Sequence, residues 1–351
     1  MRSILLTGGN GYIGTHTCVS FLKKNYKIIV LDSNVNSSPI SLKRVKEIFK
    51  LRKNSQENII FEKGDIRNEI FLRNVFINAI KRNSPIKAVV HFAGLKSVKD
   101  SVIDPLSYWD SNLFGALCLL KVMNKYKCKT IVFSSSAAIY GKNIKNPIEE
   151  ISLIKPISPY GDTKVAVEKI LENLFLSDTK HEWRIANLRY FNPIGAHHTG
   201  LIGENPYDVP SNIFPYICGV AIGKYKKLNI FGNDWPTKDG TGVRDYIHVM
   251  DLADSHLSAM EFLLNNEPQI INLNIGTGIG TSVLELVKIF EKVNNCIIPF
   301  DFYDRRLGDV AQLIANNKNA IYKLNWKPKK SLEDMCRDGW KWQLKNPNGY
   351  L

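Results

Sequence analysis

The sequence predicts an α/β fold, with a doubly wound parallel sheet of the Rossmann type and a smaller C-terminal mixed α/β domain. Short apolar runs alternate with longer amphipathic stretches through the first half of the chain, as in βαβ units. The apolar runs show no polar alternation, which is typical of strands that helices cover on both faces. A glycine-rich turn follows the first run, and loops rich in Gly, Pro, Asn and His begin near residue 190.

Each expected strand is a short run rich in β-branched residues, and a stretch with helical spacing follows most of them. The expected strands are Ser3–Leu6, Lys27–Leu31, Ile59–Phe61, Ala88–Phe92, Thr130–Ser134 and Ile185–Leu188. The expected helices include Gly14–Lys24, Asp110–Tyr126 and Thr163–Phe175. This order predicts a parallel sheet with helices on both faces.

The change of texture near residue 190 divides the chain into two expected domains. Residues 1–190 form the nucleotide-binding domain and residues 191–351 form the domain for the second ligand, with some C-terminal elements returning to the first. The loops at 192–215 and 232–242 are placed to close over that ligand. No internal repeat or low-complexity linker interrupts the chain, so we expect the two domains to share an interface.

Composition excludes several classes of protein. Apolar residues make up 44% of the 351 residues, which suffices for a sizeable core and excludes wholesale disorder. No apolar run approaches the length of a transmembrane helix, and Ile4-Leu5-Leu6 is too short for a signal-peptide core. The six cysteines are scattered without a C-x-x-C pair, which predicts reduced thiols. We therefore expect a soluble cytoplasmic protein with no membrane partner.

The charge is strongly basic, with a net charge of +14, of which residues 1–175 carry +13. A basic half can indicate a nucleic-acid partner. The densest basic run, residues 43–53, contains a single aromatic residue, however, and lacks the aromatic interleaving that stacks bases. We interpret it as a solvated helix face and expect no nucleic-acid partner.

The glycine-rich turn predicts a dinucleotide site. Gly8, Gly11 and Gly14 follow the first strand and open the first helix, where backbone N–H groups and the helix dipole favour a pyrophosphate. Asp32 ends the second strand, where a carboxylate accepts both ribose hydroxyls of adenosine and repels a 2′-phosphate. The pattern therefore favours NAD over NADP.

Two further loops follow strands that line the same crevice. Asp65 and Ile66, after the third strand, are candidates for holding the adenine amino group and ring face. The fourth strand runs into Phe92, Ala93, Gly94 and Lys96, which we also assign to the cofactor.

A catalytic group is predicted at the end of the fifth strand. Ser136 closes that strand, and Tyr160 and Lys164 form a Y-x-x-x-K motif whose spacing puts both side chains on one helical face. An ammonium and the positive nicotinamide ring favour a phenolate, so we expect the pKa of Tyr160 to lie below its usual value near 10. The set suits proton transfer coupled to hydride transfer.

These motifs resemble the extended short-chain dehydrogenase/reductase family and, within it, the UDP-glucose 4-epimerases. The resemblance covers essentially the whole chain. It is carried by the segments TGGNGYIGTHTCV, GDIRNE, VVHFAGLKSV, FSSSAAIYG, SPYGDTK, LRYFNPIGAH and, most specifically, IFGNDWPTKDGTGVRDYIHVMDLAD.

The resemblance implies roles for individual residues. Ser136, Tyr160 and Lys164 match the catalytic positions. The positions that contact NAD are matched by Tyr12, Ile13, Asp32, Asn36, Ser37, Asp65, Ile66, Phe92, Lys96, Asn112, Ser136, Tyr160, Lys164 and Phe191. The positions that hold the UDP-sugar are matched by Lys96, Ser136, Tyr160, Asn192, Asn212, Asn229, Phe231, Arg244, Arg306, Asp309 and Leu313.

The implied reaction is the reversible epimerisation of UDP-galactose and UDP-glucose at C4. Tyr160 takes the proton of the 4-hydroxyl, NAD takes the C4 hydride, and the 4-keto sugar rotates before both return. Lys164 lowers the pKa of Tyr160 and contacts the NAD ribose, and Ser136 hydrogen-bonds the reacting hydroxyl. The resemblance also implies a homodimer packed through the helices at Asp110–Tyr126 and Tyr160–Phe175. The histidines show no metal-ligand spacing, so no metal site is expected.

Three positions depart from the family pattern. Ala138 stands where many members carry a hydroxyl residue, and Asp162 stands between Tyr160 and Lys164 where Lys or Ser types are usual. Leu313 occupies the position that is Tyr in members restricted to glucose and galactose, and smaller in members that take N-acetylated sugars. Because leucine is intermediate in size, the sequence leaves open whether UDP-GlcNAc and UDP-GalNAc are substrates.

Three other functions fit the sequence less well. A 4,6-dehydratase on the same fold carries an Asp-Glu pair after its catalytic threonine, whereas Ser136 is followed by Ala137 and Ala138. A UDP-glucuronate enzyme needs a group to pair the sugar carboxylate, and no motif supplies one. A non-catalytic module that binds NAD or nucleic acid does not need the Ser, Tyr and Lys set.

Overall fold

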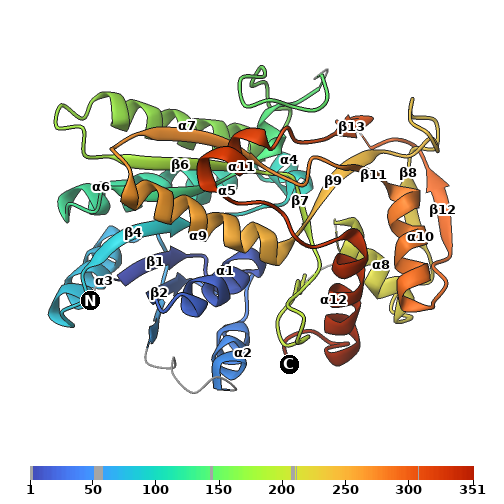
Figure 1. Ribbon diagram of the computed structural model, residues 1–351, viewed down its shortest axis with the longest axis horizontal. Coiled ribbons are helices and arrows are strands. Elements are labelled where there is room, and N and C mark those ends of the chain that lie inside the picture. The colour runs from blue at the N-terminus through green and yellow to red at the C-terminus, as the bar shows by residue number, and fades with distance from the viewer. Residues whose placement is uncertain (1–2, 51–57, 143–144, 207–209, 211, 307) are drawn as a thin grey trace.

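A seven-stranded parallel sheet forms the larger part of the molecule (Figure 1). The computed structural model describes residues 3–50, 58–142, 145–206, 210, 212–306 and 308–351. The strand order is β10-β6-β5-β4-β1-β2-β3. The strands are β1 (Ser3–Thr7), β2 (Lys27–Asp32), β3 (Ile59–Lys63), β4 (Ile86–His91), β5 (Thr130–Ser136), β6 (Arg184–Tyr190) and β10 (Ile270–Ile275). All neighbours pair in parallel, which confirms the predicted doubly wound sheet.

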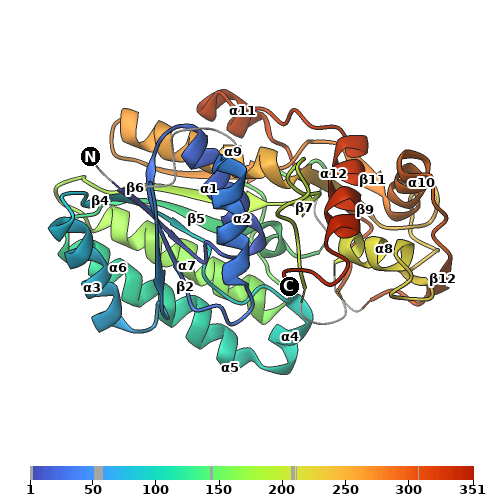
Figure 2. The same cartoon turned by 90° about the horizontal axis from the view of Figure 1, so that it is seen from below.

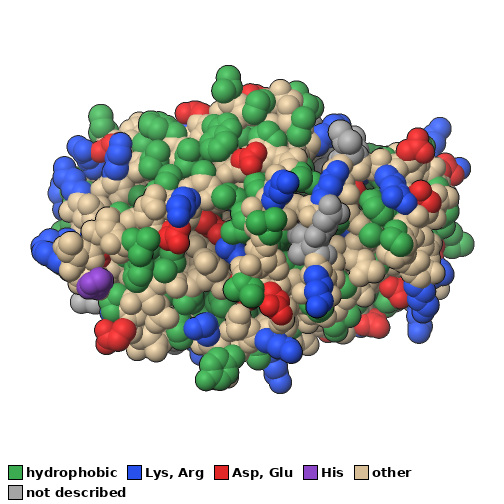
Figure 3. Space-filling view, turned by 90° about the horizontal axis from the view of Figure 1, so that it is seen from above, with side chains coloured by type: hydrophobic (Ala, Val, Ile, Leu, Met, Phe, Trp, Pro, Cys, Tyr) green, Lys and Arg blue, Asp and Glu red, His purple; other side chains and the backbone are tan. Residues whose placement is uncertain are grey.

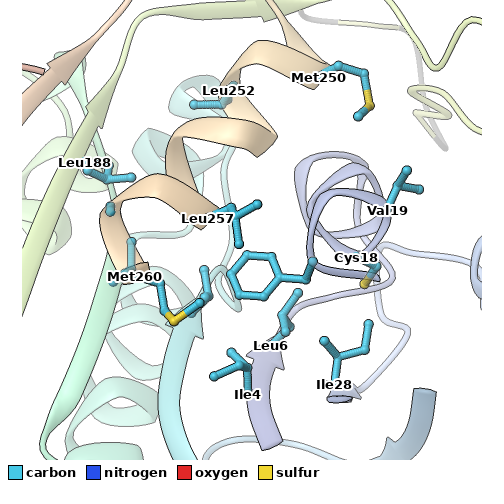
Figure 4. Packing of buried hydrophobic residues seen from close by; sticks show 14 of the residues in the cluster. Ile4, Leu6, Cys18, Val19, Ile28, Leu188, Met250, Leu252, Leu257 and Met260 are labelled. Atoms are coloured by element: carbon cyan, nitrogen blue, oxygen red, sulfur yellow. The ribbon is translucent and has the colours of Figure 1, made fainter. Parts of the chain in front are cut away.

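Helices cover both faces of this sheet (Figures 1 and 2). One face packs against α1 (Tyr12–Lys23), α2 (Pro39–Lys50), α9 (Val249–Asn265) and α11 (Lys318–Leu324). The other face packs against α3 (Glu69–Lys81), α6 (Gly115–Lys125) and α7 (Pro159–Leu176). Alternate residues of each strand enter the two clusters: Ile4 and Leu6 point to the first, and Leu5 points to the second. Figure 4 shows the first cluster, where α1 and α9 meet over β1.

The expected strands and helices are present with small differences at their ends. The helix expected at Asp110–Tyr126 begins with a π-helical segment, η2 (Trp109–Phe114), before it continues as α6. Short helices α4 (Val98–Ile103) and α5 (Pro105–Tyr108) precede it. Ser158 caps α7 by accepting a hydrogen bond from the Gly161 N–H at 3.2 Å, so the helix starts at Pro159, one residue before Tyr160.

The chain after residue 190 builds a smaller mixed region to the right in Figure 1. Its main sheet contains β7 (Asn192–Ile194), β9 (Val243–His248), β11 (Gly280–Ser282) and β13 (Gln312–Leu313). A two-stranded sheet contains β8 (Leu228–Phe231) and β12 (Phe300–Tyr303). The helices are α8 (Ile213–Ala221), α10 (Val283–Asn294) and α12 (Leu332–Lys345). Their apolar faces share a third core cluster.

Elements from the second half, among them β10, α9 and α11, complete the first sheet and its covering helices. β10 pairs with β6 from Ile270 to Ile275, and α9 packs along α1 on one face of the sheet. The seventh strand therefore comes from beyond residue 190. The two regions are joined directly where β9 of the smaller region ends at His248 and α9 begins at Val249.

The basic run at residues 43–53 falls partly within the described chain. Leu42, Val45, Ile48 and Phe49 of α2 are buried, and Lys43 on the same helix is exposed. Lys43 fits the expected solvated helix face, whereas the half-buried Arg44 donates to the Leu201 carbonyl at 3.3 Å and lies 5.2 Å from the centre of the Tyr350 ring. Residues 51–53 lie outside the described residues. Within the described chain, no helix is both long and apolar enough to cross a membrane.

Candidate active site

The predicted site residues gather where the parallel strands end. Gly8 follows β1, Asp32 ends β2, Phe92 follows β4 and Ser136 ends β5. The carboxyl ends of neighbouring parallel strands meet at one edge of a sheet, which is where ligands of such folds bind. The smaller region begins at the end of β6 and lies beyond this edge (Figure 1).

The glycine turn at the start of α1 is packed too closely against other backbone atoms to carry side chains. Gly8 has a φ of +70°, and a Cβ there would lie 2.6 Å from the Ala93 nitrogen. A Cβ on Gly14 would lie 2.5 Å from the Gly8 carbonyl oxygen. Gly11 caps the helix without a side-chain bond, and no acidic residue lies in the first turn. The start of α1 therefore carries no side chain that caps or neutralises its terminal N–H groups, which suits an anion there.

Asp32 is buried and held in a fixed orientation. Its Oδ2 accepts a hydrogen bond from the Asn10 N–H at 2.9 Å, and its Oδ1 accepts from the Asn34 N–H at 2.9 Å and the Ser37 hydroxyl at 2.8 Å. Asn36, on the same loop, is exposed. The carboxylate is thus locked at the end of β2, next to the glycine turn.

The remaining predicted cofactor positions divide between the surface and the interior. Asp65 is paired with Arg67 at 2.6 Å, and this partner lowers the pKa of the carboxyl group. Ile66 is buried. The Asn112 amide is used within the protein: it accepts from the Leu95 N–H at 2.7 Å and donates to the Thr163 hydroxyl at 3.1 Å. Asn112 therefore ties the loop after β4 to the first turn of α7.

Tyr12, Ile13 and Phe191 lie where the two regions meet. The Tyr12 hydroxyl donates to the Gly195 carbonyl at 2.7 Å, which links α1 to the segment after β7. Ile13 packs against the first core cluster. Phe191 is buried in a small cluster that also contains Ala137 and contacts Leu313.

Ser136, Tyr160 and Lys164 come together at the end of β5. The Ser136 Oγ accepts from the Ala138 N–H at 3.1 Å, and the Ser136 side chain lowers the pKa of the Tyr160 phenol. The Lys164 Nζ donates to the Ser134 carbonyl at 2.8 Å and lies 5.6 Å from the Tyr160 ring centroid. Because Ala138 donates to Ser136, the serine proton is free to point at the phenol oxygen.

Burial dominates the ionisation of this group. It raises the pKa of Tyr160 to about 12, against the lowering effect of the Ser136 hydrogen bond. This direction is opposite to the one expected from the sequence, because the phenol is far more desolvated than a Y-x-x-x-K motif reveals. Burial also lowers the pKa of Lys164 to about 8, and the Glu168 carboxylate opposes that change.

Charged residues cluster in the smaller region, where Nη1 of Arg244 donates to the Val243 and Val310 carbonyls, each at 2.9 Å. The Arg244 guanidinium donates to the Asp309 carboxylate at 2.5 Å, and the Arg306 guanidinium lies 4.0 Å from the centre of the Phe231 ring. Burial and then Arg244 lower the pKa of Arg306, whereas Asp309 raises it. Asn229 lies on the same strand as Phe231. Two guanidiniums beside an aromatic ring suit a diphosphate joined to a base.

Two other polar residues belong to the same region and were missed by the sequence reasoning. Glu204 accepts from Lys96 and from Asn212, each at 3.0 Å, and so joins two predicted ligand-binding residues. It lies in the Gly- and Pro-rich loop that the sequence singled out, which was the available signal. The Tyr246 hydroxyl is buried and has no hydrogen-bond partner among the described residues. The same is true of the Asn192 Oδ1.

Metal-ligating side chains do not gather into a metal centre in the described chain. No group of three or more His, Cys, Asp or Glu residues within it is arranged to hold a metal ion. The donors that do gather at the site are guanidinium, ammonium, amide and hydroxyl groups, which suit anions and sugar hydroxyls.

Comparisons with known proteins agree with this geometry. A family model described as GDP-mannose 4,6 dehydratase matches residues 5–339. The chain is 49% identical over 348 residues to the UDP-glucose 4-epimerase of Bacillus subtilis strain 168, with 99% of this chain and 98% of the relative covered. The chain belongs to the UDP-glucose 4-epimerase family.

Solved epimerase structures share the whole fold. The UDP-glucose 4-epimerase of Stenotrophomonas maltophila, solved with NAD and formylated UDP-arabinopyranose, matches with a TM-score of 0.93 and 41% identity over 99% of both chains. The enzyme of Bifidobacterium longum, solved with NAD⁺ and UDP, matches with a TM-score of 0.91 and 41% identity over 99% of this chain and 100% of the other. Membership of the UDP-glucose 4-epimerase family confirms the resemblance drawn from the motifs.

Proposed function

We propose that this protein interconverts UDP-galactose and UDP-glucose at C4 with a tightly bound NAD, and so serves galactose metabolism. The observation that carries the proposal is the Ser136, Tyr160 and Lys164 group at the end of β5, beside a glycine turn shaped for a phosphate. Relatives of the family with the same fold bind NAD and UDP or UDP-sugars. The larger sheet, with β10 and α9, holds NAD, and most of residues 191–351 holds the UDP-sugar.

In the proposed reaction, Tyr160 accepts the proton of the sugar 4-hydroxyl and later returns it. Bound NAD⁺ accepts the C4 hydride and gives it back, and its positive ring favours the phenolate. Ser136 donates to the same oxygen, and the Lys164 ammonium contacts the nicotinamide ribose and stabilises the phenolate. A buried phenol whose pKa burial raises to about 12 needs both cations to ionise near neutral pH.

The nucleotide anchors the substrate while the sugar turns over. Arg244 and Arg306 pair with the diphosphate, Asp309 accepts the ribose hydroxyls, and Phe231 packs against the base, with Asn229 and Asn212 reading its edges. The Asn192 Oδ1, which lacks a partner within the described residues, is free to accept from the ligand. Because these groups bind only the UDP portion, the 4-keto sugar is able to rotate and present its other face to the cofactor.

The proposal includes a homodimer in the cytoplasm. Trp109 and Phe114 on η2 are 36% and 45% exposed although they are large and apolar, which suits a contact with a second copy. Figure 3 shows hydrophobic side chains gathered between charged ones on the face seen from above. All six cysteines are free thiols, which fits a reducing compartment.

The first test is an assay of purified protein without added NAD. UDP-galactose is supplied and UDP-glucose is measured, with UDP-GalNAc in a parallel reaction. Conversion of UDP-galactose without added cofactor supports both the reaction and the tight binding of NAD. Absence of conversion, also after NAD is added, would exclude the proposed function and favour a dehydratase or a binding protein.

A further inference from the structure

Three consecutive serines, residues 134–136 at the end of β5, contact side chains on three successive turns of α7. The carbonyl of the first serine accepts from Lys164 at 2.8 Å. The hydroxyl of the second donates to the Glu168 Oε1 at 2.5 Å. The hydroxyl of the third bonds the Tyr160 phenol. Glu168 is thus hydrogen-bonded to the end of β5, as Lys164 is one helical turn earlier.

Glu168 is a buried carboxylate clamped by a buried guanidinium. Arg189 on β6 donates from Nε to Oε1 at 3.1 Å and from Nη2 to Oε2 at 2.7 Å. The remaining donors of Arg189 bond the Tyr140 hydroxyl at 3.0 Å and the Glu150 carbonyl at 2.8 Å. Because both carboxylate oxygens and the guanidinium have hydrogen-bond partners, the ion pair is fixed in position.

The Lys164 ammonium lies in an environment that disfavours its charge, because it is removed from water. It is buried, donates to a carbonyl rather than to a carboxylate, and lies 5.0 Å from the Phe133 ring centroid. The titratable and charged groups around it are Tyr160 and Glu168 on α7, His91 at the end of β4, and Arg189 and Tyr190 on β6. Of these, Glu168 carries the negative charge that favours the ammonium, whereas burial keeps His91 neutral.

We propose that Glu168, clamped by Arg189 and Ser135, is a positioning residue that keeps the Lys164 amine protonated and aimed at the reacting tyrosine. The expected change in the kcat/KM profile rests on the proposed function. The expected change in the titration of Lys164 does not. The carboxylate acts across one helical turn without touching substrate or cofactor. Its separation from the lysine lets the ammonium remain available to a ligand instead of being consumed in an ion pair.

The test compares Glu168→Gln with Glu172→Gln as the matched control. Glu172 lies on the same helix one turn later, where it is exposed and pairs with Lys169 at 2.6 Å. Loss of the Glu168 charge lowers the pKa of Lys164, so the alkaline limb of the kcat/KM profile for UDP-galactose moves to lower pH by about one unit. Glu172→Gln leaves the limb in place. Glu168→Asp, which keeps the charge, restores the limb even where kcat is reduced.

A second measurement reads Lys164 without using activity. Competitive labelling with acetic anhydride, followed by peptide mass spectrometry, gives the pH dependence of Lys164 acetylation in each protein. A shift of the Lys164 titration to lower pH in Glu168→Gln supports the proposal. This result would still support it if the wild-type protein showed no epimerase activity and the proposed function failed. Where Glu168→Gln does not fold, Glu168→Gln with Arg189→Met removes both charges and is compared in the same way.

The proposal is overturned if the Lys164 titration stays in place. A fall in kcat with an unmoved alkaline limb and an unmoved labelling curve would mean that Glu168 and Arg189 only support the fold. Loss of activity in Glu168→Asp equal to that in Glu168→Gln, with identical labelling curves, would lead to the same conclusion.

Discussion

At the residue scale, the reacting phenol is defined by what surrounds it rather than by its motif. Tyr160 is desolvated, bonded to Ser136 and close to Lys164, and burial raises the pKa of the phenol to about 12. A phenol in this state is protonated until a cation approaches it. In the proposed reaction, proton transfer by Tyr160 is therefore coupled to the positive charge of the bound cofactor.

Tyr160→Phe removes the proton acceptor and keeps the ring. We expect turnover of UDP-galactose to fall by about 10²–10⁴-fold, the usual contribution of a positioned acid or base. UDP affinity by calorimetry stays unchanged, because the ring still fills its space. Near wild-type turnover in this variant would remove Tyr160 from the mechanism.

Leu313→Tyr tests the open question of sugar range. Leu313 is half-buried against the cluster that contains Phe191 and Ala137, so a larger side chain protrudes into the space next to the end of β5. We expect kcat/KM for UDP-GalNAc to fall by at least about tenfold relative to UDP-galactose, which corresponds to about 1.4 kcal/mol. Leu313→Ala serves as the opposite variant, and an equal effect on both sugars would show that this position does not select between them.

At the element scale, the turn from β1 to α1 is the most tightly constrained part of the site. A Cβ on Gly14 would meet the Gly8 carbonyl oxygen at 2.5 Å and the Gly9 Cα at 2.7 Å, both of which are backbone atoms. Backbone atoms cannot rotate away as the end of a side chain can. Close packing and cofactor binding therefore depend on the same missing side chain.

Gly14→Ala consequently opens the turn. We expect a loss of about 1–3 kcal/mol in the free energy of unfolding, as for other overpacked sites, and purification without bound NAD. Thermal melting and chromatography of the nucleotide released by acid measure the two effects. Gly223→Ala is the control, since it shares a positive φ with Gly8 but meets nothing within 4 Å, and it should keep its NAD.

At the scale of the whole molecule, buried histidines make the fold sensitive to acid. Burial lowers the pKa of His16, His91 and His256 to about 3 each. In the unfolded chain these groups titrate near 6.5. Between pH 6.5 and about 3 the unfolded state therefore binds more protons than the native state, and stability is lost as the pH falls through that window.

Urea unfolding at several pH values checks this linkage. We expect the free energy of unfolding to be greatest above pH 6.5 and to fall below it by about 1.4 kcal/mol per pH unit for each of these histidines. An exposed histidine offers the control: His181→Gln leaves the pH dependence as it is. Equal stability at pH 7.5 and pH 5.0 would contradict the burial of these rings.

The assembly is tested on the exposed apolar face of η2. Phe114→Glu places a charge on the surface proposed to contact a second copy, so sedimentation should change from twice the chain mass to the single-chain mass. Ile80→Glu on α3, where the replaced side chain is 50% exposed, is the control and leaves the mass unchanged. A single-chain mass for the wild-type protein would refute the homodimer.

Much of the fold and site was predictable because the signals lie close together in the chain. Continuous apolar runs gave the first six strands, and local spacing placed Gly8 and Asp32 at strand ends and Tyr160 and Lys164 on one helical face. These patterns follow from the two- and 3.6-residue periods of strands and helices, which depend only on neighbouring residues.

Only the tertiary structure decided the features that join distant segments. β10 enters the sheet beside β6, about 80 residues earlier in the chain, and Glu204 bridges Lys96 and Asn212. The clamp of Arg189 on Glu168 and the burial of Tyr160 likewise depend on which elements pack together. The sequence by itself determined which chemistry the chain carries, and the packing decided its protonation, because desolvation is a property of the assembled core.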